Sequence, residues 1–466
     1  MTPPSPTTTL MPALSAYIAS ALAQPLPPEV IEKAKFHLLD TLSSMVSGSQ
    51  LLAGQKAIAF VEAQGISSTQ AVLAGTTLRT TAINAAMANG MFAHADETDD
   101  SHAASLTHPG CGIVPAVLAA AELYGRSGTA MLRAMTLGYD VCCRLTLSLD
   151  PYAFRAAGHS SHTFGPNFGA AAAAGALAGV DAQQARYLMS YAAQQASGVS
   201  CWMRDKDHVE KAFDFGGMAA RNGMTAALMV ALGFTGVDDV FSGERCFYDA
   251  YGESPDRTAL GRELGTRYEL LGTSIKRWTV GSPIQAPVDA LDLLIRQHGL
   301  RATDVRSMHV RIPHESLTIV NNRDMPEICL QHLLAVLLLD GAMSFASAHD
   351  RPRMDDPQVL AIRNGITLQG DDVLSRAMPS RQGIVEVTLT NGETLREHTL
   401  AVRGTPGNPM TRQELQDKCM ELLGPVLGAA QAARLCATVW AIEDESDARH
   451  LASLLQPTDS SRARMT

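Results

Sequence analysis

The sequence predicts a mainly α protein with a smaller α+β part. Three observations indicate this class. Apolar residues recur at helical spacing through most of residues 13–250. Strand-like alternation and a hairpin signal begin only after about residue 270. A helix-start motif near residue 411 then returns the chain to helical sequence. Because 466 residues exceed the size of one ordinary core, two domains are expected.

The first part of the chain is predicted to be a helix bundle. A helix should begin at Pro27-Pro28-Glu29, since proline fits the first helical turn, and should end at Gly48. Further helices are predicted over residues 82–93, 113–124, 128–149, 166–178, 182–199 and 217–232. Many of them are rich in alanine and glycine, which lets helices approach closely and suits a compact bundle without a large sheet.

The region after residue 270 combines strands and helix. Three strands are predicted from alternating apolar residues, at 305–312, 384–389 and 394–400. Asn391-Gly392 lies between the last two and is typical of a type I′ hairpin turn. An apolar helix is predicted over 327–346. Thr411 and Glu414 form a capping box, which predicts the start of the C-terminal helical part.

Composition and charge exclude several classes of protein. The 46% hydrophobic content and the mean hydropathy of +0.02 are typical of an ordinary soluble globular protein. The net charge of −10, without any Lys/Arg run, argues against nucleic-acid binding. An anionic ligand would therefore need a local basic pocket. The longest small-apolar run, residues 170–180, is too short to span a membrane.

Cysteine usage and the N-terminal segment predict a cytoplasmic protein. The eight cysteines form no CxxC pair and no metal-binding spacing, which fits isolated thiols in a reducing compartment. Residues Met1–Pro12 lack the basic and apolar regions of a signal peptide. Their content of proline, serine and threonine predicts a flexible tail.

Residues 94–108 form the most polar cluster between apolar helices. This segment holds three histidines and four carboxylates within fifteen residues. Burying so many ionisable groups is costly unless they are paired or used, so the segment is a candidate functional site. Metal binding is one alternative, although the spacing matches no closed zinc site. Capping is another, in which Asp99, Asp100 and Ser101 serve a helix start and the surface.

A second cluster precedes the alanine-rich helix. Glycine and proline punctuate residues 158–169 and predict a loop that presents His159, Ser160 and His162 just before a helix. A helix N-terminus beside imidazoles and hydroxyls can receive a carboxylate. One such histidine could be a packing residue, but two within four positions favour an acid–base role.

Lysines are rare enough for their positions to be informative. The chain has seven lysines against thirty arginines. Lys211 and Lys276 lie beside aromatic residues and glycines at predicted element boundaries. Lys276-Arg277 would offer a carboxylate both a point charge and a bidentate fork. Together with the histidines, these cations fit proton abstraction α to a carboxylate, where the developing negative charge needs fixed cations. The sequence contains no phosphate loop, GxSxG elbow or cysteine nucleophile.

These motifs resemble the MmgE/PrpD family, which includes 2-methylcitrate dehydratases, cis-aconitate decarboxylases and iminodisuccinate epimerases. The most specific match is His94…Asp99-Asp100-Ser-His102…His108-Pro-Gly110, followed by Pro115-Ala-Val-Leu-Ala119. Further matches are Leu26–Lys35, His37–Thr41, Phe234-Thr-Gly236, Leu330–Leu334 and Arg403–Asn408. The resemblance therefore covers essentially the whole chain.

The resemblance implies a two-domain enzyme. It implies an all-helical domain formed by residues 1–269 and 406–466, and an α+β lid formed by residues 270–405. It also implies a homodimer that needs no metal or organic cofactor. The active site is expected between the two domains.

The resemblance also assigns site residues position by position. The family's acidic residue falls on Glu97, where Asp is more usual, and its hydroxyl falls on Ser101. Its motif histidine falls on His108, and its two cations fall on Lys211 and Lys276. Three departures surround the expected substrate pocket, at Ser160, Asp214 and Gln285, where the family commonly or often has histidine. With Ser160 in that place, His159 or His162 would have to substitute.

The resulting prediction is a cofactor-independent lyase of the dehydratase type acting on a small di- or tricarboxylic acid. His108 and either His159 or His162 would move protons. Lys211, Lys276 and Arg277 would hold carboxylates and stabilise the enediolate-like intermediate. Asp99 and Asp100 would orient the histidines or cap the neighbouring helix, and Ser101 would position the substrate or the leaving group. Glu97 and Ser160 are further substrate-binding candidates. An epimerase, a decarboxylase, a non-catalytic carboxylate binder and a metal enzyme remain as alternatives.

Overall fold

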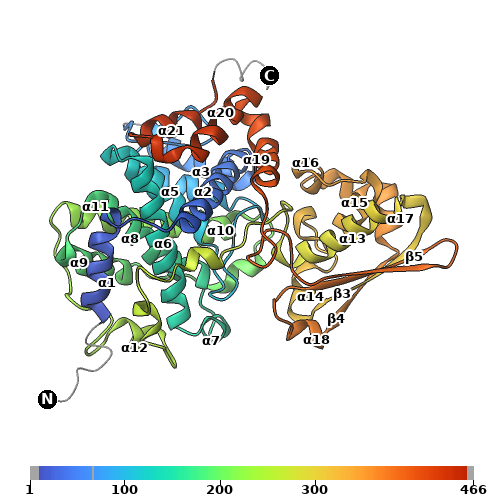
Figure 1. Ribbon diagram of the computed structural model, residues 1–466, viewed down its shortest axis with the longest axis horizontal. Coiled ribbons are helices and arrows are strands. Elements are labelled where there is room, and N and C mark those ends of the chain that lie inside the picture. The colour runs from blue at the N-terminus through green and yellow to red at the C-terminus, as the bar shows by residue number, and fades with distance from the viewer. Residues whose placement is uncertain (1–9, 66–67, 459–466) are drawn as a thin grey trace. The chain divides into compact units, whose positions relative to one another are not determined.

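The computed structural model describes residues 10–65 and 68–458 and is mainly helical, with a small α+β part (Figure 1). This confirms the predicted fold class. The chain divides into two compact units. The helical unit contains the described residues up to Ala95, then Asp99–Thr273, and those from Leu415 onward. The α+β unit contains Ser274–Glu414 together with Asp96–Thr98.

The helical unit is built mainly from eleven helices together with α19, which is described below. They are α1 (Leu10–Ser20), α2 (Pro28–Gly48), α3 (Leu52–Ala63), α4 (Ala82–Ala93), α5 (Pro109–Tyr124), α6 (Gly128–Ser148), α8 (Ser161–Ala178), α9 (Ala182–Gln194), α11 (Met218–Ala231), α20 (Ala429–Trp440) and α21 (Ala448–Leu454). The centre of this unit is α8, which packs against α5, α6 and α11. Shorter helices are α7 (Pro151–Ala156), α10 (Val209–Ala212) and α12 (Phe247–Tyr251). Strands β1 (Ala71–Val72) and β2 (Arg79–Thr80) form the one small sheet described in this unit.

Two local predictions for this unit are wrong. The flexible tail predicted over Met1–Pro12 ends earlier, because α1 begins at Leu10 and buries Met11; residues 1–9 lie outside the described residues. The loop predicted over 158–169 is mostly helix, since α8 begins at Ser161 and contains Pro166. Residues 161–177 are all buried. A helix satisfies their backbone polar groups internally, and this outweighs the loop preference of glycine and proline.

Glycines allow α4 to approach the turn that precedes α11. Residues Phe213–Gly217 form a π-helical turn, called the π-turn below. A Cβ on Gly216 would lie 2.0 Å from the carbonyl oxygen of Gly90 in α4, so neither position has room for a side chain. This contact brings the end of α4, which His94 follows directly, next to the π-turn.

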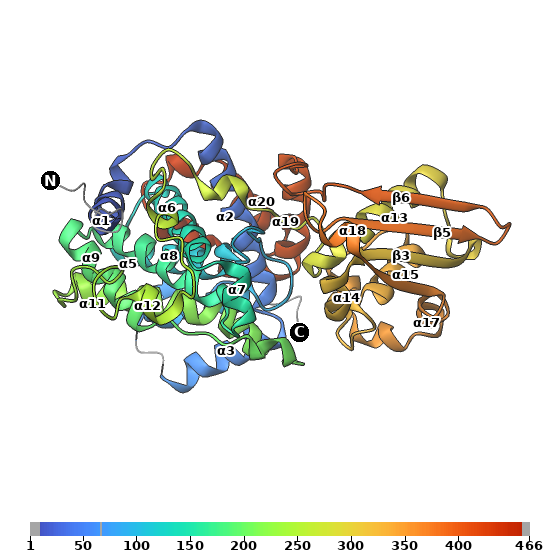
Figure 2. The same ribbon diagram turned by 90° about the horizontal axis from the view of Figure 1, so that it is seen from below.

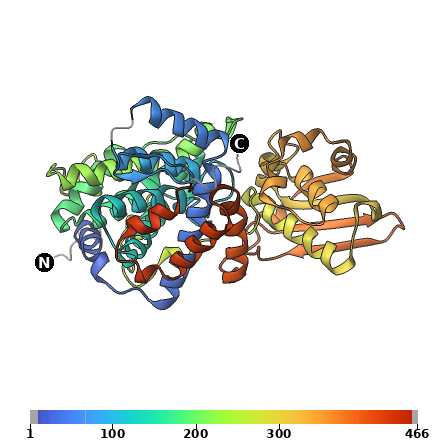
Figure 3. The same ribbon diagram turned by 90° about the horizontal axis from the view of Figure 1, so that it is seen from above.

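The C-terminal helices complete the helical unit. Helix α19 (Arg412–Leu427) begins near the predicted capping box, and α20 and α21 contact α2 and α5 respectively (Figure 3). The Lys418 ammonium lies 2.6 Å from Asp40 Oδ1, and Lys35 Nζ donates to the carbonyl of Trp440 at 2.9 Å. The two ends of the chain therefore share one core.

The α+β unit is a four-stranded sheet with helices packed on it (Figure 2). The strand order is β4 (Ile366–Asp371), β3 (Val305–Pro313), β5 (Gly383–Leu389) and β6 (Thr394–Thr399). Only β3 and β4 pair in parallel. Helix α13 (Gln285–His298) packs on β5 and β6, and α15 (Leu330–Asp340) joins the same apolar core. The shorter helices are α14 (His314–Val320), α16 (Phe345–Ala348), α17 (Pro357–Arg363) and α18 (Asp372–Ser375).

Two details of this unit differ from the sequence prediction. The hairpin is present, but only Gly392 of the Asn391-Gly392 pair has a positive φ, 92°, so the turn is not type I′. Gly392 N donates to Leu389 O, as in a three-residue hairpin loop that ends in a left-handed glycine. The helix predicted over 327–346 is shorter, because Gly341 adopts φ 71° and ends α15.

Candidate active site

One buried carboxylate bridges two histidines in the helical unit. Asp99 Oδ2 lies 2.9 Å from His94 Nδ1, and Asp99 Oδ1 lies 3.1 Å from His108 Nδ1. His94 follows α4, and His108 is the residue before α5. His94 and Asp99 are fully buried, and His108 is 7% exposed. A carboxylate at Nδ1 favours the tautomer with its proton there, which leaves Nε2 of His108 as the basic nitrogen.

The adjacent Asp100 holds the start of α5. Its Oδ1 accepts the backbone N–H of Gly110 at 2.9 Å, and its Oδ2 accepts the Tyr139 hydroxyl at 2.6 Å. His37 Nδ1 lies 2.7 Å from the same oxygen. Burial lowers the pKa of His37 to about 4, so this histidine is neutral. Asp100 therefore binds the N-terminus of α5 and two buried side chains of the bundle core.

Three histidines gather around the ring of Phe215, which the π-turn carries. His94 and His162 both stack on Phe215, at centroid distances of 4.1 and 3.8 Å and with nearly parallel planes. His108 meets the same ring edge-on at 5.3 Å, and lies 5.3 Å from His162. Burial, followed by repulsion from His108, holds the pKa of His162 well below its ordinary value. We call His94, His108, His162 and Phe215 the imidazole cluster.

The structure separates the two loop histidines. His162 lies on α8 in the imidazole cluster, and its buried Nδ1 makes no hydrogen bond with any residue that the structure describes. His159 instead stacks on Phe154 at 4.5 Å and lines a separate cavity of about 260 Å³ with Tyr251. The structure therefore brings His162, and not His159, together with His108.

Lys211 places a cation beside the imidazole cluster. It lies on α10, immediately before the π-turn. Its ammonium is 5.2 Å from the Phe215 ring centroid and 5.6 Å from that of Trp202. Both distances are within the range of a cation–π interaction.

Ser160 and Asp214, two of the departures from the family pattern, contact each other. The Ser160 hydroxyl donates to Asp214 Oδ2 at 2.5 Å and accepts from Trp202 Nε1 at 3.2 Å. Thr163 Oγ1 donates to the backbone carbonyl of Asp214 at 2.8 Å. Burial raises the pKa of Asp214 to about 6, against the lowering effect of these hydroxyls.

Residues 96–98 belong to the α+β unit, although they lie within the polar segment 94–108. Lys276 Nζ donates to the Glu97 carbonyl at 2.6 Å and lies 3.7 Å from the Glu97 carboxylate. His349 Nε2 lies 3.0 Å from Asp96 Oδ2, and this carboxylate raises the pKa of His349 despite its burial. Lys276 is 3% exposed and Glu97 is 6% exposed. These contacts form a second polar group, which lies within the α+β unit.

Arg277 does not accompany Lys276. Its guanidinium pairs with Asp289 at 3.6 Å and Asp292 at 3.3 Å, and stacks over Trp278 at 4.4 Å. Gln285, the third departure, donates to the carbonyls of Trp278 and Val280 and so braces the segment after Lys276. Lys276 and Arg277, predicted from the sequence to hold one carboxylate together, therefore contact different partners.

The remaining predicted residue, Ser101, is buried and precedes a short backbone bridge. It is 3% exposed, and His102 and Thr107 pair directly after it. His102 Nδ1 lies 2.8 Å from the Ser105 hydroxyl, and its Nε2 lies 3.6 Å from Glu269. His102 is thus held by its own turn.

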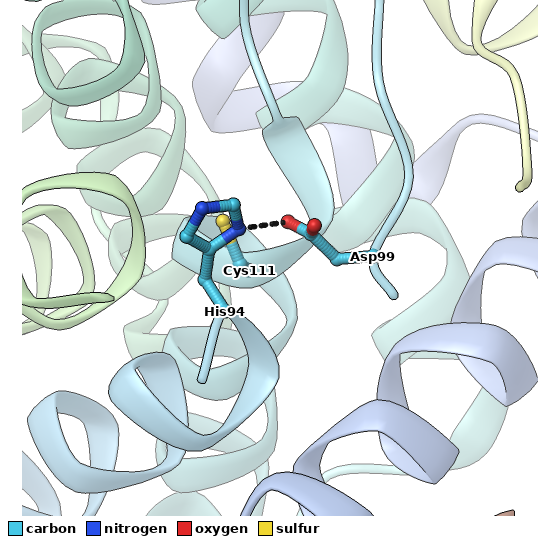
Figure 4. A group of neighbouring side chains, drawn as sticks. All are labelled: His94, Asp99 and Cys111. Carbon is cyan, nitrogen blue, oxygen red and sulfur yellow. Dashed lines mark ion pairs between the residues drawn. The ribbon is translucent and has the colours of Figure 1, made fainter. Parts of the chain in front are cut away.

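His94, Asp99 and Cys111 form a group whose ligand atoms could hold a metal ion (Figure 4). These atoms lie within 4.8 Å of one another. Each already contacts a protein partner, however. His94 Nδ1 faces Asp99, Asp99 also faces His108, and the Cys111 thiol donates to the carbonyl of His108 at 3.2 Å. Each member of the group is therefore already engaged by at least one neighbour within the protein.

Phe215 and Trp202 belong to this region, although no sequence motif predicts them, and His94 is predicted only as part of the 94–108 segment. The available signal was the run Phe213-Asp-Phe-Gly-Gly217 directly after Lys211, where aromatic residues and small residues alternate with a carboxylate. Such a run marks a close helix contact beside a cation.

Two family models match this chain. Residues 12–259 match the MmgE/PrpD N-terminal domain, and residues 278–444 match the MmgE/PrpD C-terminal domain. A cis-aconitate decarboxylase-like protein of Aspergillus oryzae is 24% identical over 92% of this chain and 94% of its own length. The cis-aconitate decarboxylase of Mus musculus is 23% identical over 92% of this chain and 89% of its own. A 2-methylcitrate dehydratase-like protein of A. oryzae is 28% identical over 31% of this chain and 32% of its own.

Proposed function

Because the chain belongs to the MmgE/PrpD family of enzymes, we propose that it is a cofactor-independent lyase of the dehydratase type acting on a small di- or tricarboxylic acid. The observation that carries this proposal is the imidazole cluster beside Lys211. It offers two imidazoles for proton transfer, one oriented by Asp99 and one neutral, next to a cation. Proton abstraction α to a carboxylate needs these groups.

The proposed reaction begins with removal of a proton from the carbon α to a carboxylate. His162, which is neutral, or Nε2 of His108 accepts this proton as the C–H bond breaks. The electron pair moves onto the carboxylate as an enediolate, whose charge Lys211 stabilises. The pair then forms the C=C bond as the C–O bond to the leaving hydroxyl breaks. The imidazole that took the proton then donates it to the leaving hydroxyl, so water leaves and the imidazole is neutral again.

The α+β unit contributes the second predicted cation. Lys276 is held by Glu97 through its backbone carbonyl and its carboxylate. We assign Lys276 and Glu97 to substrate binding on the basis of the family resemblance. Loss of Lys211 or Lys276 should abolish turnover. Lys206, exposed and close to Lys211 in the sequence, provides the matched control.

Decarboxylation is the second candidate reaction, because relatives matched over 92% of this chain carry the name cis-aconitate decarboxylase. Loss of CO₂ breaks a C–C bond and leaves its electron pair on the α carbon. An imidazolium of the cluster would then protonate that carbon. The same residues therefore serve either reaction, and the substrate decides between them.

An activity screen tests the proposal and separates these reactions. Methylcitrate, citrate, cis-aconitate and iminodisuccinate are incubated with the protein in deuterated water and followed by NMR. A new alkene signal indicates dehydration, and loss of a carboxyl carbon as CO₂ indicates decarboxylation. Deuterium in an unchanged skeleton indicates epimerisation. Near-wild-type rates in both Lys211→Ala and Lys276→Ala would refute the assignment.

Metal dependence provides an independent test of the cofactor-independent mechanism. Full activity is expected after treatment with a chelator, with elemental analysis showing no stoichiometric metal. Activity that is lost on chelation and restored by one divalent metal would instead favour a metal enzyme. The Cys111→Ser variant, which changes one possible ligand, would then identify the group in Figure 4 as its site.

A further inference from the structure

Ser160 uses its hydroxyl in an unusual way for its position. It is the residue before α8, where serine ordinarily accepts a hydrogen bond from an N–H of the first helical turn. The Ser160 side chain makes no such capping bond. Its hydroxyl instead links Trp202 Nε1 to the Asp214 carboxylate. The start of α8 thus forgoes a favourable cap, and the hydroxyl joins two side chains instead.

The chemistry of the three groups fixes the direction of this hydrogen-bonded chain. An indole N–H can only donate, and an ionised carboxylate can only accept. Ser160 is the member that does both, so the order is Trp202 to Ser160 to Asp214. All three are buried, at 8%, 0% and 6% exposure. Truncating Ser160 or Asp214 would therefore leave a buried polar group without its partner.

The Trp202 ring, which Ser160 holds by a hydrogen bond, also contacts the imidazole cluster. It meets Phe215 edge-on at 4.7 Å and His162 edge-on at 5.5 Å. The Lys211 ammonium lies 5.6 Å from its centroid. The Trp202 ring therefore lies against both the Lys211 ammonium and His162, one of the two proton-transfer histidines.

We infer that Asp214 and Ser160 are positioning residues that hold the Trp202 ring against His162 and Lys211, and so fix the place of the ammonium that binds the substrate carboxylate. Only the last clause rests on the proposed function. Ser160 contacts Trp202 directly, and Asp214 acts on the ring through the hydroxyl of Ser160.

Indole and lysine NMR test this inference on the full-length protein without any ligand. The chain has three tryptophans and seven lysines, so both sets of signals are small. Trp202→Phe and Lys211→Gln identify the two resonances of interest. Ser160→Ala and Asp214→Ala should each move the Trp202 indole N–H signal upfield, because the hydrogen bond is lost or weakened. Both should also shift the side-chain signal of Lys211.

Matched variants separate positioning from general damage. Ser161→Ala removes a neighbouring hydroxyl that donates to the Leu106 carbonyl, and it should leave both signals in place. Ser160→Thr keeps a hydroxyl and should restore them. If Ser160→Ala or Asp214→Ala fails to fold, Asp214→Asn keeps an acceptor oxygen and should shift both signals in the same direction by less. Unmoved indole signals of Trp278 and Trp440 show that the remaining structure is intact.

Two results would overturn the inference. One is a Trp202 signal that stays in place in both the Ser160 and the Asp214 variants. The other is a Trp202 signal that moves while the side-chain signal of Lys211 remains unchanged. With a substrate from the screen, Ser160→Ala should raise KM by about tenfold and change kcat less, since one hydrogen bond to a charged group is lost. Coupled NMR shifts in a protein that turns over no carboxylate would refute the proposed function and support the positioning role.

Discussion

At the scale of single residues, the site depends on which imidazole each carboxylate orients. Asp99 lies within ion-pair distance of Nδ1 of both His94 and His108, and its hydrogen bond with His108 favours the tautomer of that ring with the proton on Nδ1. His162 has no such carboxylate and is kept neutral by burial. The cluster therefore contains one base oriented by a carboxylate, His108, and one neutral imidazole, His162. Substituting each side chain can distinguish their roles.

The first prediction concerns the two loop histidines. His162→Asn should lower kcat by about 10²- to 10⁴-fold, since a proton-transfer group is lost. His159→Asn should retain near-wild-type kcat, because His159 packs on Phe154 away from the cluster. Steady-state kinetics on the substrate from the screen measures both. The assignment is wrong if His159→Asn is the inactive variant.

The second prediction concerns pH. The pKa of Asp214 is raised to about 6 by burial, so Asp214 is ionised above that pH and protonated below it. The ionised form is the stronger acceptor for Ser160, so kcat/KM should fall as the pH drops through 6. His162 stays neutral over this range and should not contribute to the fall. In Asp214→Asn this limb should disappear and leave a lower, flatter profile; an unchanged limb would contradict the role of Asp214.

At the scale of elements, the contact between α4 and the π-turn sets the geometry of the cluster. Gly90 and Gly216 meet backbone to backbone. His94 lies just beyond α4, and Phe215 lies within the π-turn, so their stacking depends on this contact. The close approach of Gly90 and Gly216 therefore positions the side chains of His94 and Phe215.

The third prediction follows from that contact. Gly216→Ala should lower the free energy of unfolding by about 1–3 kcal/mol, because its Cβ would overlap the Gly90 carbonyl. Gly236→Ala is the control, since its Cβ would meet neighbours at ordinary distances of 3.4 Å, and it should change stability by less than about 0.5 kcal/mol. Urea denaturation measures both. Equal effects of the two substitutions would contradict the close contact.

Element boundaries also explain how much of the site could be predicted from the sequence. His108, Asp99 and Lys211 can be predicted as candidates from the sequence, because their residue types and spacing form recognisable motifs. The choice between His159 and His162 was left open, because α8 was expected to begin at 166 and its phase at Ser161 was unknown. The partners of Arg277 depend on α13, which supplies Asp289 and Asp292 from farther along the chain. Such tertiary partners leave no local pattern in the sequence.

At the scale of the whole molecule, each unit has its own core, and the helical unit needs both ends of the chain. The Lys418–Asp40 pair joins a C-terminal helix to an N-terminal one, and both side chains are buried. Burial raises the pKa of Asp40 to about 6 even though Lys418 lowers it. Burying this ion pair costs desolvation free energy, and removing either partner would leave the other as an uncompensated buried charge.

The fourth prediction concerns this junction. Lys418→Met should lower the free energy of unfolding by about 3–5 kcal/mol at neutral pH, because Asp40 loses its counter-ion. The loss should shrink below pH 6, since Asp40 then takes up a proton and no charge remains buried. The double variant Asp40→Asn/Lys418→Met should recover part of the stability. Denaturation curves at pH 5 and pH 8 measure this, and equal losses at both would contradict it.

The division of the chain has a consequence for its synthesis. The helical unit lacks α20 and α21 until residues 274–414 have been translated. Asp40 lacks its counter-ion until Lys418 has been synthesised. The N-terminal helices are therefore without their final packing partners while the ribosome synthesises the α+β unit. Once residue 414 has emerged from the ribosome, and before α20 and α21 follow, the nascent chain should therefore contain a folded α+β unit and an unfinished helical one. This reverses the usual order in which N-terminal domains fold first.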